Sequence, residues 1–266
     1  MSRADTVMPL LQGPWMSRGG EKLPVTALPA LSRDAIHNLS LQWSGILTPE
    51  MHALLECSCG ISGTPIGSVD FTGCWYPEEP LSIFRPCITL AIDDTGRRWV
   101  AEAGRTRGLP GPVWCVFPQP EVAMWVHRSL GDFLVRLHHH MRRNTLAQWM
   151  TSMSRRARIL WATRHASAMA VPVAFTRLRE LRGWLAELPL DSWVYDLRNP
   201  AAHRGLPYGL ARERGELYRC GRLPVFAFAN FASPAPEAID TEVEGLPQFA
   251  EPATARLTQA HTQGTA

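Results

Sequence analysis

A hairpin pattern in the middle of the chain constrains the fold more than any other feature of this sequence. Two short runs rich in β-branched and aromatic residues, 87–92 and 97–102, flank the turn Asp93-Asp94-Thr95-Gly96. Runs of this kind around an Asp/Gly turn are typical of two antiparallel strands. A third run, 113–117, follows a loop rich in glycine and proline and predicts a further strand. The centre of the chain is therefore expected to be an antiparallel sheet.

A helix is expected to follow these strands. Ser129-Leu130-Gly131-Asp132 has the form of an N-cap followed three residues later by a carboxylate, which is a common helix start. The apolar residues that come next recur at helical spacing: Phe133, Leu134, Leu137 and Met141. Antiparallel strands with a helix covering one face make an α+β core, and this is the fold class that we expect. Residues 87–137 contain no catalytic motif.

Composition narrows the class of protein. The 266 residues carry a net charge of +3, which is too small by itself to indicate a nucleic-acid-binding protein. Lys22 is the only lysine, and the preference for arginine runs through the whole chain, so it does not by itself indicate bidentate recognition. The six cysteines are scattered and are expected to be buried thiols. With no signal peptide and no segment able to span a bilayer, we expect a cytoplasmic protein.

The first sixty residues predict an arm and two helices. Residues 1–30 show no sustained period and are expected to form an extended or partly disordered arm. A short helix is expected over 32–41. A clearer helix starts at Thr48, with Pro49 and Glu50 in its first turn and Gly60 as its stop. Its buried stripe is expected to contain Met51, Leu54 and Leu55.

The segment 61–84 reads as loops and short strands and contains a candidate recognition loop. Two adjacent aromatic residues stand beside two carboxylates between prolines: Trp75, Tyr76, Glu78 and Glu79. Large aromatic side chains on a conformationally restricted loop are typical of a recognition surface. The alternative, weighed equally, is that Trp75 anchors the loop in the core and that the carboxylates are merely solvated.

These segments follow the order of a known family. The helix beginning Leu47-Thr48-Pro49-Glu50-Met51-His52-Ala53-Leu54-Leu55, the hairpin 88–102, the strand 113–117 and the helix start Ser129-Leu130-Gly131-Asp132-Phe133-Leu134 together resemble the SUKH superfamily, the Smi/Knr-type domain of bacterial toxin-immunity proteins. The resemblance covers about residues 30–137. The chain departs from the family in carrying Cys59-Gly60 where Asn-Gly is usual, and in a C-terminal half that has no counterpart in the minimal domain.

The resemblance implies both a fold and a function. The fold is an antiparallel sheet with flanking helices over residues 31–137. The function is that of an immunity protein in a polymorphic toxin system, such as one whose toxins are delivered by type VI secretion. Such a protein binds a cognate toxin and neutralises it by occluding its active site, without turnover and without a cofactor.

The second half of the chain is rich in arginine. Between residues 136 and 182 the only acid is Glu180, against ten arginines: 136, 142, 143, 155, 156, 158, 164, 177, 179 and 182. Leu146, Trp149, Met150 and Met153 predict that a helical stripe continues, and a second helix is expected over 172–189. Residues 191–202 read as a loop and 222–231 as a possible strand. We therefore expect a mainly helical extension over 138–232 and a disordered acidic tail over 233–266.

Residues able to carry chemistry do not assemble into a recognisable site. His138, His139 and His140 are consecutive, so on a helix they cannot converge on one metal ion, and solvated surface histidines are expected. Cys57-Ser58-Cys59 lacks the second ligand pair of a zinc site. Cys57 and His52 lie on neighbouring faces of one helix, and the chain has no Gly-x-Ser-x-Gly elbow and no Gly-rich phosphate loop. We expect no enzymatic activity, no metal and no cofactor.

The sequence thus predicts a protein that works by binding another protein. The residues expected to contact the toxin are Trp75, Tyr76, Glu78, Glu79, Asp93, Asp94, Arg155, Arg156 and Arg158. The arginines would dock on an acidic surface, where charge steers association. Two alternatives stay open: a nucleic-acid-binding or regulatory adaptor that uses the Arg-rich helices, and a hydrolase whose site the sequence does not reveal.

Overall fold

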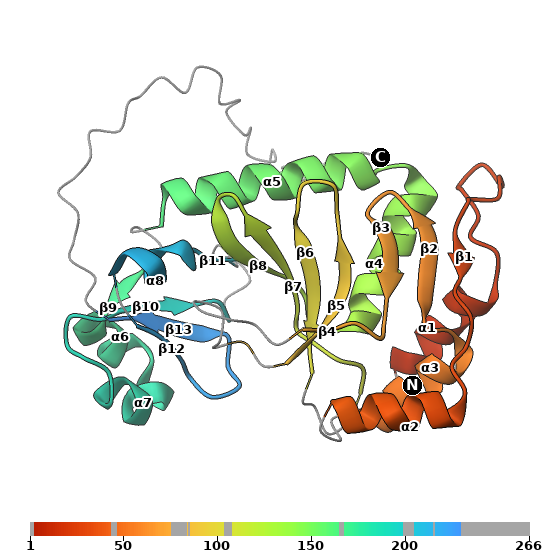
Figure 1. Ribbon diagram of the computed structural model, residues 1–266. Helices are drawn as coiled ribbons and strands as arrows, with labels where there is room; N and C mark the ends of the chain where they lie inside the picture. Colours follow the sequence, from red (N-terminus) through yellow and green to blue (C-terminus); the bar gives the residue numbers. More distant parts are fainter. Residues whose placement is uncertain are drawn as a thin grey trace, which may run out of the picture. The chain divides into compact units, whose positions relative to one another are not determined.

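A computed structural model describes residues 3–43, 47–75, 84, 86–103, 108–164, 168–198, 205–214 and 216–229. Within these residues, helices flank three antiparallel sheets, so the expected α+β class is confirmed (Figure 1). No helix in this part of the chain is both long enough and apolar enough to cross a membrane.

The largest sheet contains the predicted hairpin. Its strand order is β11-β8-β7-β6-β5-β4, and each neighbouring pair is antiparallel. The strands are β4 (Cys74–Trp75), β5 (Cys87–Ile92), β6 (Arg98–Glu102), β7 (Val113–Pro118), β8 (Glu121–His127) and β11 (Gly205–Leu206). The hairpin β5–β6 and the strand β7 are confirmed, whereas β8, which pairs with β7, was not expected. The turn at Asp93 is closed by hydrogen bonds from Asp93 N to Arg97 O (3.1 Å) and from Gly96 N to Asp93 O (2.8 Å).

Helices cover one face of this sheet. They are α1 (Arg3–Gln12), α3 (Pro49–Cys57), α4 (Leu130–Arg143) and α5 (Leu146–Ala162). Alternate residues of each strand, such as Trp99 of β6 and Cys115 of β7, point into the core that these helices share. The expected caps are present: Thr48 Oγ1 accepts from Met51 N, and Ser129 Oγ accepts from Asp132 N (3.2 Å each).

The N-terminal arm is more ordered than expected. Residues 3–12 form α1, whose Val7 and Leu11 are buried in the core beside α3 and α4. The sequence showed no helical period there because Pro9 interrupts the pattern, so tertiary packing decides the conformation. The helix α2 (Arg33–Gln42) confirms the short helix expected over 32–41. A three-stranded sheet, β1-β2-β3, joins the arm to the core through Thr26–Ala27, Gly60–Thr64 and Gly67–Asp70.

A four-stranded sheet, which we call the small sheet, covers the other face of the large sheet. Its order is β12-β13-β10-β9, formed by Leu217–Arg219, Val225–Phe228, Trp193–Asp196 and Met169–Ala170. Tyr195, Phe226 and Phe228 pack against Val100 and Trp114 in a second core between the sheets. The opposite side of the small sheet carries α6 (Val171–Arg177), η1 (Arg179–Leu181) and α7 (Arg182–Ala186) around a third core. The large sheet is therefore buried on both faces.

The C-terminal half contains more strand than the sequence predicted. The single helix expected over 172–189 is broken into α6, η1 and α7, and the loop expected over 191–202 contains β10. The possible strand within 222–231 is confirmed as β13. A further helix, α8 (Gly209–Arg214), precedes β12. Residues 1–232 form one compact unit, so the expected boundary at 137/138 falls inside α4; the predicted tail lies outside the described residues.

Candidate partner-binding surface

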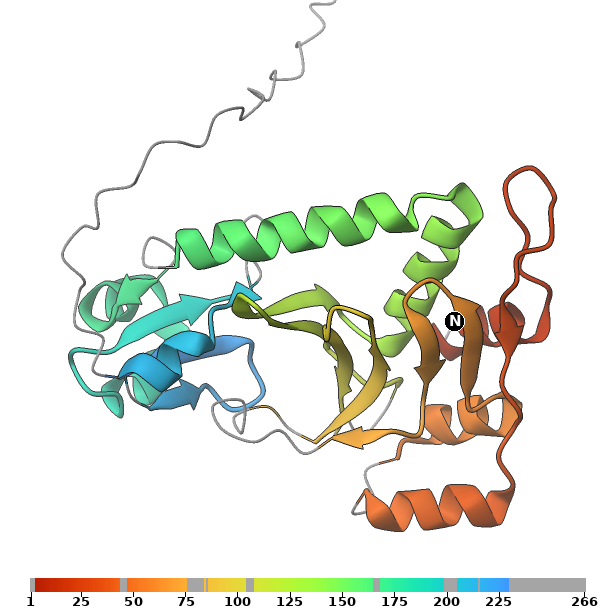
Figure 2. The same cartoon turned by 45° about the horizontal axis from the view of Figure 1, so that its top comes forward.

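The helix α5 presents the predicted arginines on a firmly packed element. Leu146, Met153, Ala157 and Leu160 recur at helical spacing and are buried against the large sheet. The strand β11 passes so close that a Cβ on Gly205 would lie 2.4 Å from Leu160 Cδ1. In both ribbon views α5 crosses the strands at the end where the β5–β6 and β7–β8 turns lie (Figure 2).

Arg155, Arg156 and Arg158 lie on the exposed side of α5. No carboxylate in the described part of the chain is within ion-pair distance of any of the three. The sequence has no acidic residue between Asp132 and Glu180, so neither the second half of α4 nor α5 contributes a negative charge. The outer side of these helices is a positively charged surface that no described carboxylate pairs with, and we call Arg155, Arg156 and Arg158 the α5 arginine face.

The structure separates the Arg-rich region into two layers. The α5 arginine face belongs to the helices that cover one side of the large sheet. Arg177, Arg179 and Arg182 instead lie on α6, η1 and α7, which pack on the small sheet on the other side. The ten arginines therefore do not form one continuous surface.

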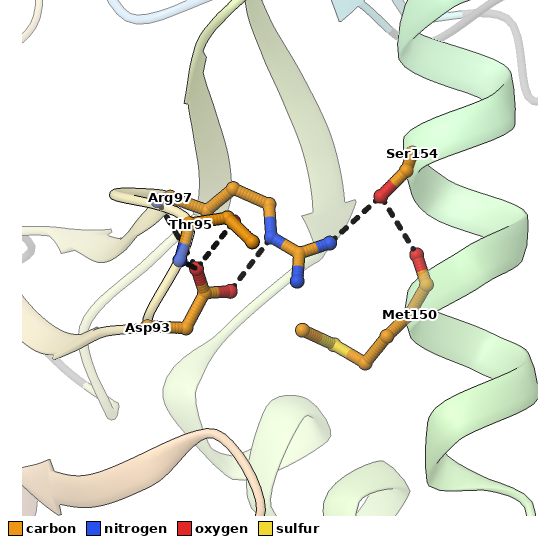
Figure 3. Close-up of polar contacts among 5 residues, drawn as sticks. All are labelled: Asp93, Thr95, Arg97, Met150 and Ser154. Carbon is orange, nitrogen blue, oxygen red and sulfur yellow. Dashed lines mark hydrogen bonds and ion pairs between the residues drawn. The ribbon is translucent and has the colours of Figure 1, made fainter.

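The Asp93 turn is used inside the protein. Asp93 Oδ1 accepts hydrogen bonds from Thr95 N (2.9 Å), Thr95 Oγ1 (2.6 Å) and Arg97 N (3.2 Å), while Oδ2 accepts from Arg97 Nε (2.7 Å). Arg97 Nη1 then donates to Ser154 Oγ (2.8 Å), which in turn donates to Met150 O (3.1 Å). Figure 3 shows this chain of contacts from the turn to α5.

The two aspartates of the turn therefore have different roles. The side chain of Asp93 is only 7% exposed, and its carboxylate oxygens are occupied by its own turn. The structure thus gives Asp93 a local organising role within the turn, and the partner contact expected from sequence stays a prediction. Asp94 is exposed and is the aspartate of this turn that a partner can reach. Arg97 and Ser154 were not expected to matter, although a cation four residues after Asp93 is a signal for this pair.

Replacing Asp93 with Asn is expected to lower the free energy of unfolding by about 1 to 2 kcal/mol, because a charged hydrogen-bond network is lost. Burial raises the pKa of Asp93, but the hydrogen bonds from Thr95 and the charge of Arg97 outweigh burial, so the net pKa is lowered. Its stabilising contribution is therefore complete at neutral pH and is lost as the carboxyl is protonated in acid. Urea denaturation at pH 7 measures the change.

The matched control for this prediction is Asp94→Asn, which removes the same charge from the next position of the turn. It should change the unfolding free energy by less than about 0.5 kcal/mol, as is usual for an exposed site. Equal effects at the two positions would contradict the role assigned to Asp93.

A cavity lies between this network and the α5 arginine face. Its volume is about 550 Å³, and it is lined by Thr95, Arg97, Phe117, Pro118, Gln119, Pro120, Ser154 and Arg158. The two hairpin turns form one wall and α5 forms the other. Phe117 and the prolines make part of the wall apolar, while Arg97 is held in place by Asp93 and Ser154. The cavity offers a place for an acidic side chain with an apolar stem.

The candidate recognition loop is only partly visible. The backbone of Trp75 pairs with Cys87 at the end of β4. The side chain of Trp75, and Tyr76, Glu78 and Glu79 as a whole, lie outside the described residues. Both interpretations of this loop therefore stay predictions.

The three consecutive histidines are not simply solvated. The His138 ring meets Trp15 edge-on, with ring centroids 4.9 Å apart. His140 stacks on Trp149 at 4.9 Å and 12°, and its Nδ1 lies 2.9 Å from Thr145 Oγ1. The prediction of solvated histidines is wrong for these two, because helix packing places aromatic partners over them. In the residues the structure describes, no three His, Cys, Asp or Glu side chains are grouped so that they could hold a metal ion.

Comparisons with known proteins add no relative to this description. No family model matches the chain, and no curated protein or solved structure matches it either.

Proposed function

We propose that this chain is an immunity protein that binds a cognate toxin in the cytoplasm and blocks the toxin's active site. The observation that carries the proposal is the α5 arginine face, three exposed arginines with no carboxylate partner among the described residues. Uncompensated charge on a well-packed helix favours fast, selective association with a surface of opposite sign.

The order of elements adds support from the resemblance. A capped helix α3, the β5–β6 hairpin, β7 and a Ser129-capped α4 occur in the order that the SUKH resemblance implies, with β2, β3 and β4 before the hairpin and β8 before α4. The proposed mechanism needs no turnover and no cofactor. A partner's acidic side chain enters the cavity between Arg97 and Arg158, and the surrounding contacts exclude substrate from the toxin.

The cavity gives the interface a candidate anchor. Arg97 is oriented by Asp93 and Ser154 before any partner arrives, so little side-chain entropy is lost when it donates hydrogen bonds to a partner's carboxylate. Arg158 contributes a second, exposed guanidinium on the opposite wall. In tight interfaces a central anchor is usually surrounded by contacts that exclude water, while nearby charges speed association.

Reversing Arg155, Arg156 and Arg158 to Glu is expected to slow association with the toxin by about tenfold or more and to flatten its salt dependence. Surface plasmon resonance against the toxin domain encoded beside this gene, at several salt concentrations, measures both effects. The wild-type protein should bind at nanomolar strength, or about 12 kcal/mol, and should protect cells that express the toxin.

The matched control is the triple reversal of Arg177, Arg179 and Arg222, which are exposed and lie in the layers of the small sheet. It changes the net charge by the same amount and should leave association nearly unchanged. Similar slowing in both triples would mean that net charge matters and that the α5 arginine face is not the interface. Absence of binding and protection by the wild type would refute the immunity function itself.

The same binding assay also tests the candidate recognition loop and the alternative function as a nucleic-acid-binding adaptor. If Tyr76→Ala, Glu78→Ala and Glu79→Ala together weaken binding by about 2 kcal/mol or more, the loop belongs to the interface. A generic DNA duplex provides the second comparison, because phosphate-driven binding falls steeply as salt rises. Retention of the duplex at physiological salt would favour the nucleic-acid-binding adaptor over the immunity protein.

A further inference from the structure

A second positively charged site lies at the far end of α4, away from the α5 arginine face. Arg18, Arg142 and Arg143 line a cavity of about 280 Å³ together with His139, and we call these four residues the arginine cup. Arg18 comes from the N-terminal arm, while the other three residues lie in the last two turns of α4. More than a hundred residues of sequence therefore separate the two sides of the cup.

The fold fixes this pairing of distant segments. The loop that carries Arg18 is closed by the bridge Met16↔Lys22 and by a hydrogen bond from Leu23 N to Trp15 O (2.7 Å). Trp15 is buried at 3% exposure and anchors the loop in the core. The backbone N–H of Arg18 donates to Arg142 O (2.9 Å), so the arm is attached directly to the end of α4. These backbone contacts bring Arg18 to the same cavity as Arg142 and Arg143.

The cup gathers arginines that form no ion pair within the described part of the chain. No carboxylate of the described residues forms an ion pair with Arg18, Arg142 or Arg143. Burial, and then the neighbouring Arg143, Arg136 and Arg142, lower the pKa of His139, so the ring contributes less positive charge than an ordinary histidine. The charge of the cup is therefore carried mainly by the three guanidinium groups.

The helix end explains only part of this arrangement. Cations in the last turn of a helix interact favourably with its dipole, which accounts for Arg142 and Arg143. The dipole does not account for Arg18, which another segment brings to the same place. The carbonyls at this end already accept hydrogen bonds: Met141 O from Asn144 N, His140 O from Thr145 N, and Arg142 O from Arg18 N. They are thus less able to repel an anion.

We propose that the arginine cup is a binding site for a diphosphate group. Guanidinium groups donate paired hydrogen bonds to phosphate oxygens, and their charge does not depend on pH in the physiological range. Three of them around one cavity match the several oxygens and the high charge of a diphosphate better than a single carboxylate. This proposal is independent of toxin binding, because the cup shares no residue with the α5 arginine face.

A neighbouring cavity gives the ligand room to extend. It has a volume of about 570 Å³ and shares His139 with the cup; Val126, His127, Val135 and Arg136 lie among its other lining residues. A diphosphate in the cup could therefore carry an organic group that lies along α4. Inorganic pyrophosphate tests for binding of a free diphosphate, and a nucleoside diphosphate tests for binding of a diphosphate that carries an organic group.

The test is a calorimetric titration of the full chain with inorganic pyrophosphate, orthophosphate and ADP at moderate salt. Pyrophosphate should bind saturably with one site and more tightly than orthophosphate. Arg18→Gln and Arg142→Gln should each weaken the binding of pyrophosphate by about tenfold or more. Arg18→Gln keeps the backbone N–H that attaches the arm, so it removes the guanidinium without releasing the loop.

Arg155→Gln is the matched control, since it removes one exposed arginine from α5 and should leave pyrophosphate binding unchanged. Thermal unfolding of each variant without ligand checks that the fold persists. ADP binding tighter than pyrophosphate assigns the ligand to nucleotides, and equal binding assigns it to free diphosphate. Failure of pyrophosphate to bind, or equal weakening by Arg155→Gln, overturns the proposal. Binding of a short single-stranded RNA without binding of pyrophosphate overturns it as well.

Discussion

Replacing Glu102 with Gln should lower the free energy of unfolding by about 3 to 5 kcal/mol, because it leaves a buried arginine without its counter-charge. Glu102 ends β6, and its oxygens accept from Arg219 Nη1 (3.1 Å) and Nη2 (3.0 Å) of β12. The side chains of Arg219 and Glu102 are only 5% and 3% exposed. Trp114 Nε1 donates to the same carboxylate at 2.7 Å.

The surroundings of this pair explain why the expected effect is large. The Arg219 guanidinium lies over the rings of Phe226 (5.4 Å) and Phe84 (5.8 Å), in the core between the two sheets. Water cannot easily solvate the charge that remains after the carboxylate is neutralised. Chemical denaturation at neutral pH measures the loss.

The exposed pair Arg33–Glu56 provides the control for burial. Its closest N–O distance is 3.6 Å, and the two side chains are 93% and 50% exposed. Glu56→Gln removes the same kind of charge and should cost at most about 1 kcal/mol. If Glu102→Gln costs no more than Glu56→Gln, then water reaches the pair and the two sheets are not tightly closed over it.

The buried pair also shows how the two halves of the chain depend on each other. Glu102 belongs to residues 31–137, whereas Arg219 belongs to the C-terminal half of the chain. In the run 113–117, Trp114 and Val116 are buried against the C-terminal half of the chain. Val113, Cys115 and Phe117 are buried on the opposite face of the sheet. A strand buried on both faces reads as a continuous apolar run, which is why this run was recognisable as a strand but the second layer was not.

Local signals in the sequence were sufficient for the elements that carry caps and turns. Thr48 and Ser129 predicted the starts of α3 and α4 because a side-chain oxygen there satisfies a backbone N–H within the same short segment. The Asp93 turn predicted the β5–β6 hairpin for the same reason. Each of these features involves residues fewer than five positions apart.

Elements that depend on distant contacts were not predictable in this way. The helix α1 contains Pro9 and is stabilised by packing on α3 and α4. The run 121–127 follows Pro118-Gln119-Pro120, which reads as an interruption of a strand, although the structure continues there into β8. The exposure of the α5 arginines could be predicted from helical spacing. The proximity of Arg18 to Arg142 could not, because no local sequence pattern relates the two residues.

Acidification from pH 7 to about pH 4 should cost this protein about 3 kcal/mol of stability through His127 alone. Burial lowers the pKa of His127 to about 4, and the neighbouring Arg136 and His140 act in the same direction. The usual value in an unfolded chain is about 6.5. Between these two values the unfolded chain binds a proton that the folded protein does not, so the folded state becomes less stable as the pH falls. Below about pH 4 both states are protonated, and this contribution levels off.

The surroundings of the His127 ring explain why its pKa is lowered. His127 Nε2 is buried and has no hydrogen-bond partner within the described residues, so a proton on this nitrogen would have no acceptor among them. The ring lies 5.9 Å from Phe133 and 6.0 Å from Trp149, measured between centroids. His127→Phe keeps a ring of similar size in this setting and removes the titratable group. Between pH 7 and pH 4 the unfolding free energy of both proteins should fall. The fall should be about 3 kcal/mol smaller for the variant than for the wild type.

The control is His37→Phe, because His37 is exposed on α2 and lies outside this aromatic cluster. Its pH profile should follow that of the wild type over the same range, measured by urea denaturation at half-unit steps of pH. A wild-type profile that stays flat between pH 6.5 and pH 4, or a His127→Phe profile that is parallel to it, would show that His127 gains a proton in the folded state. The cavity beside α4 would then have to admit water as far as His127 Nε2.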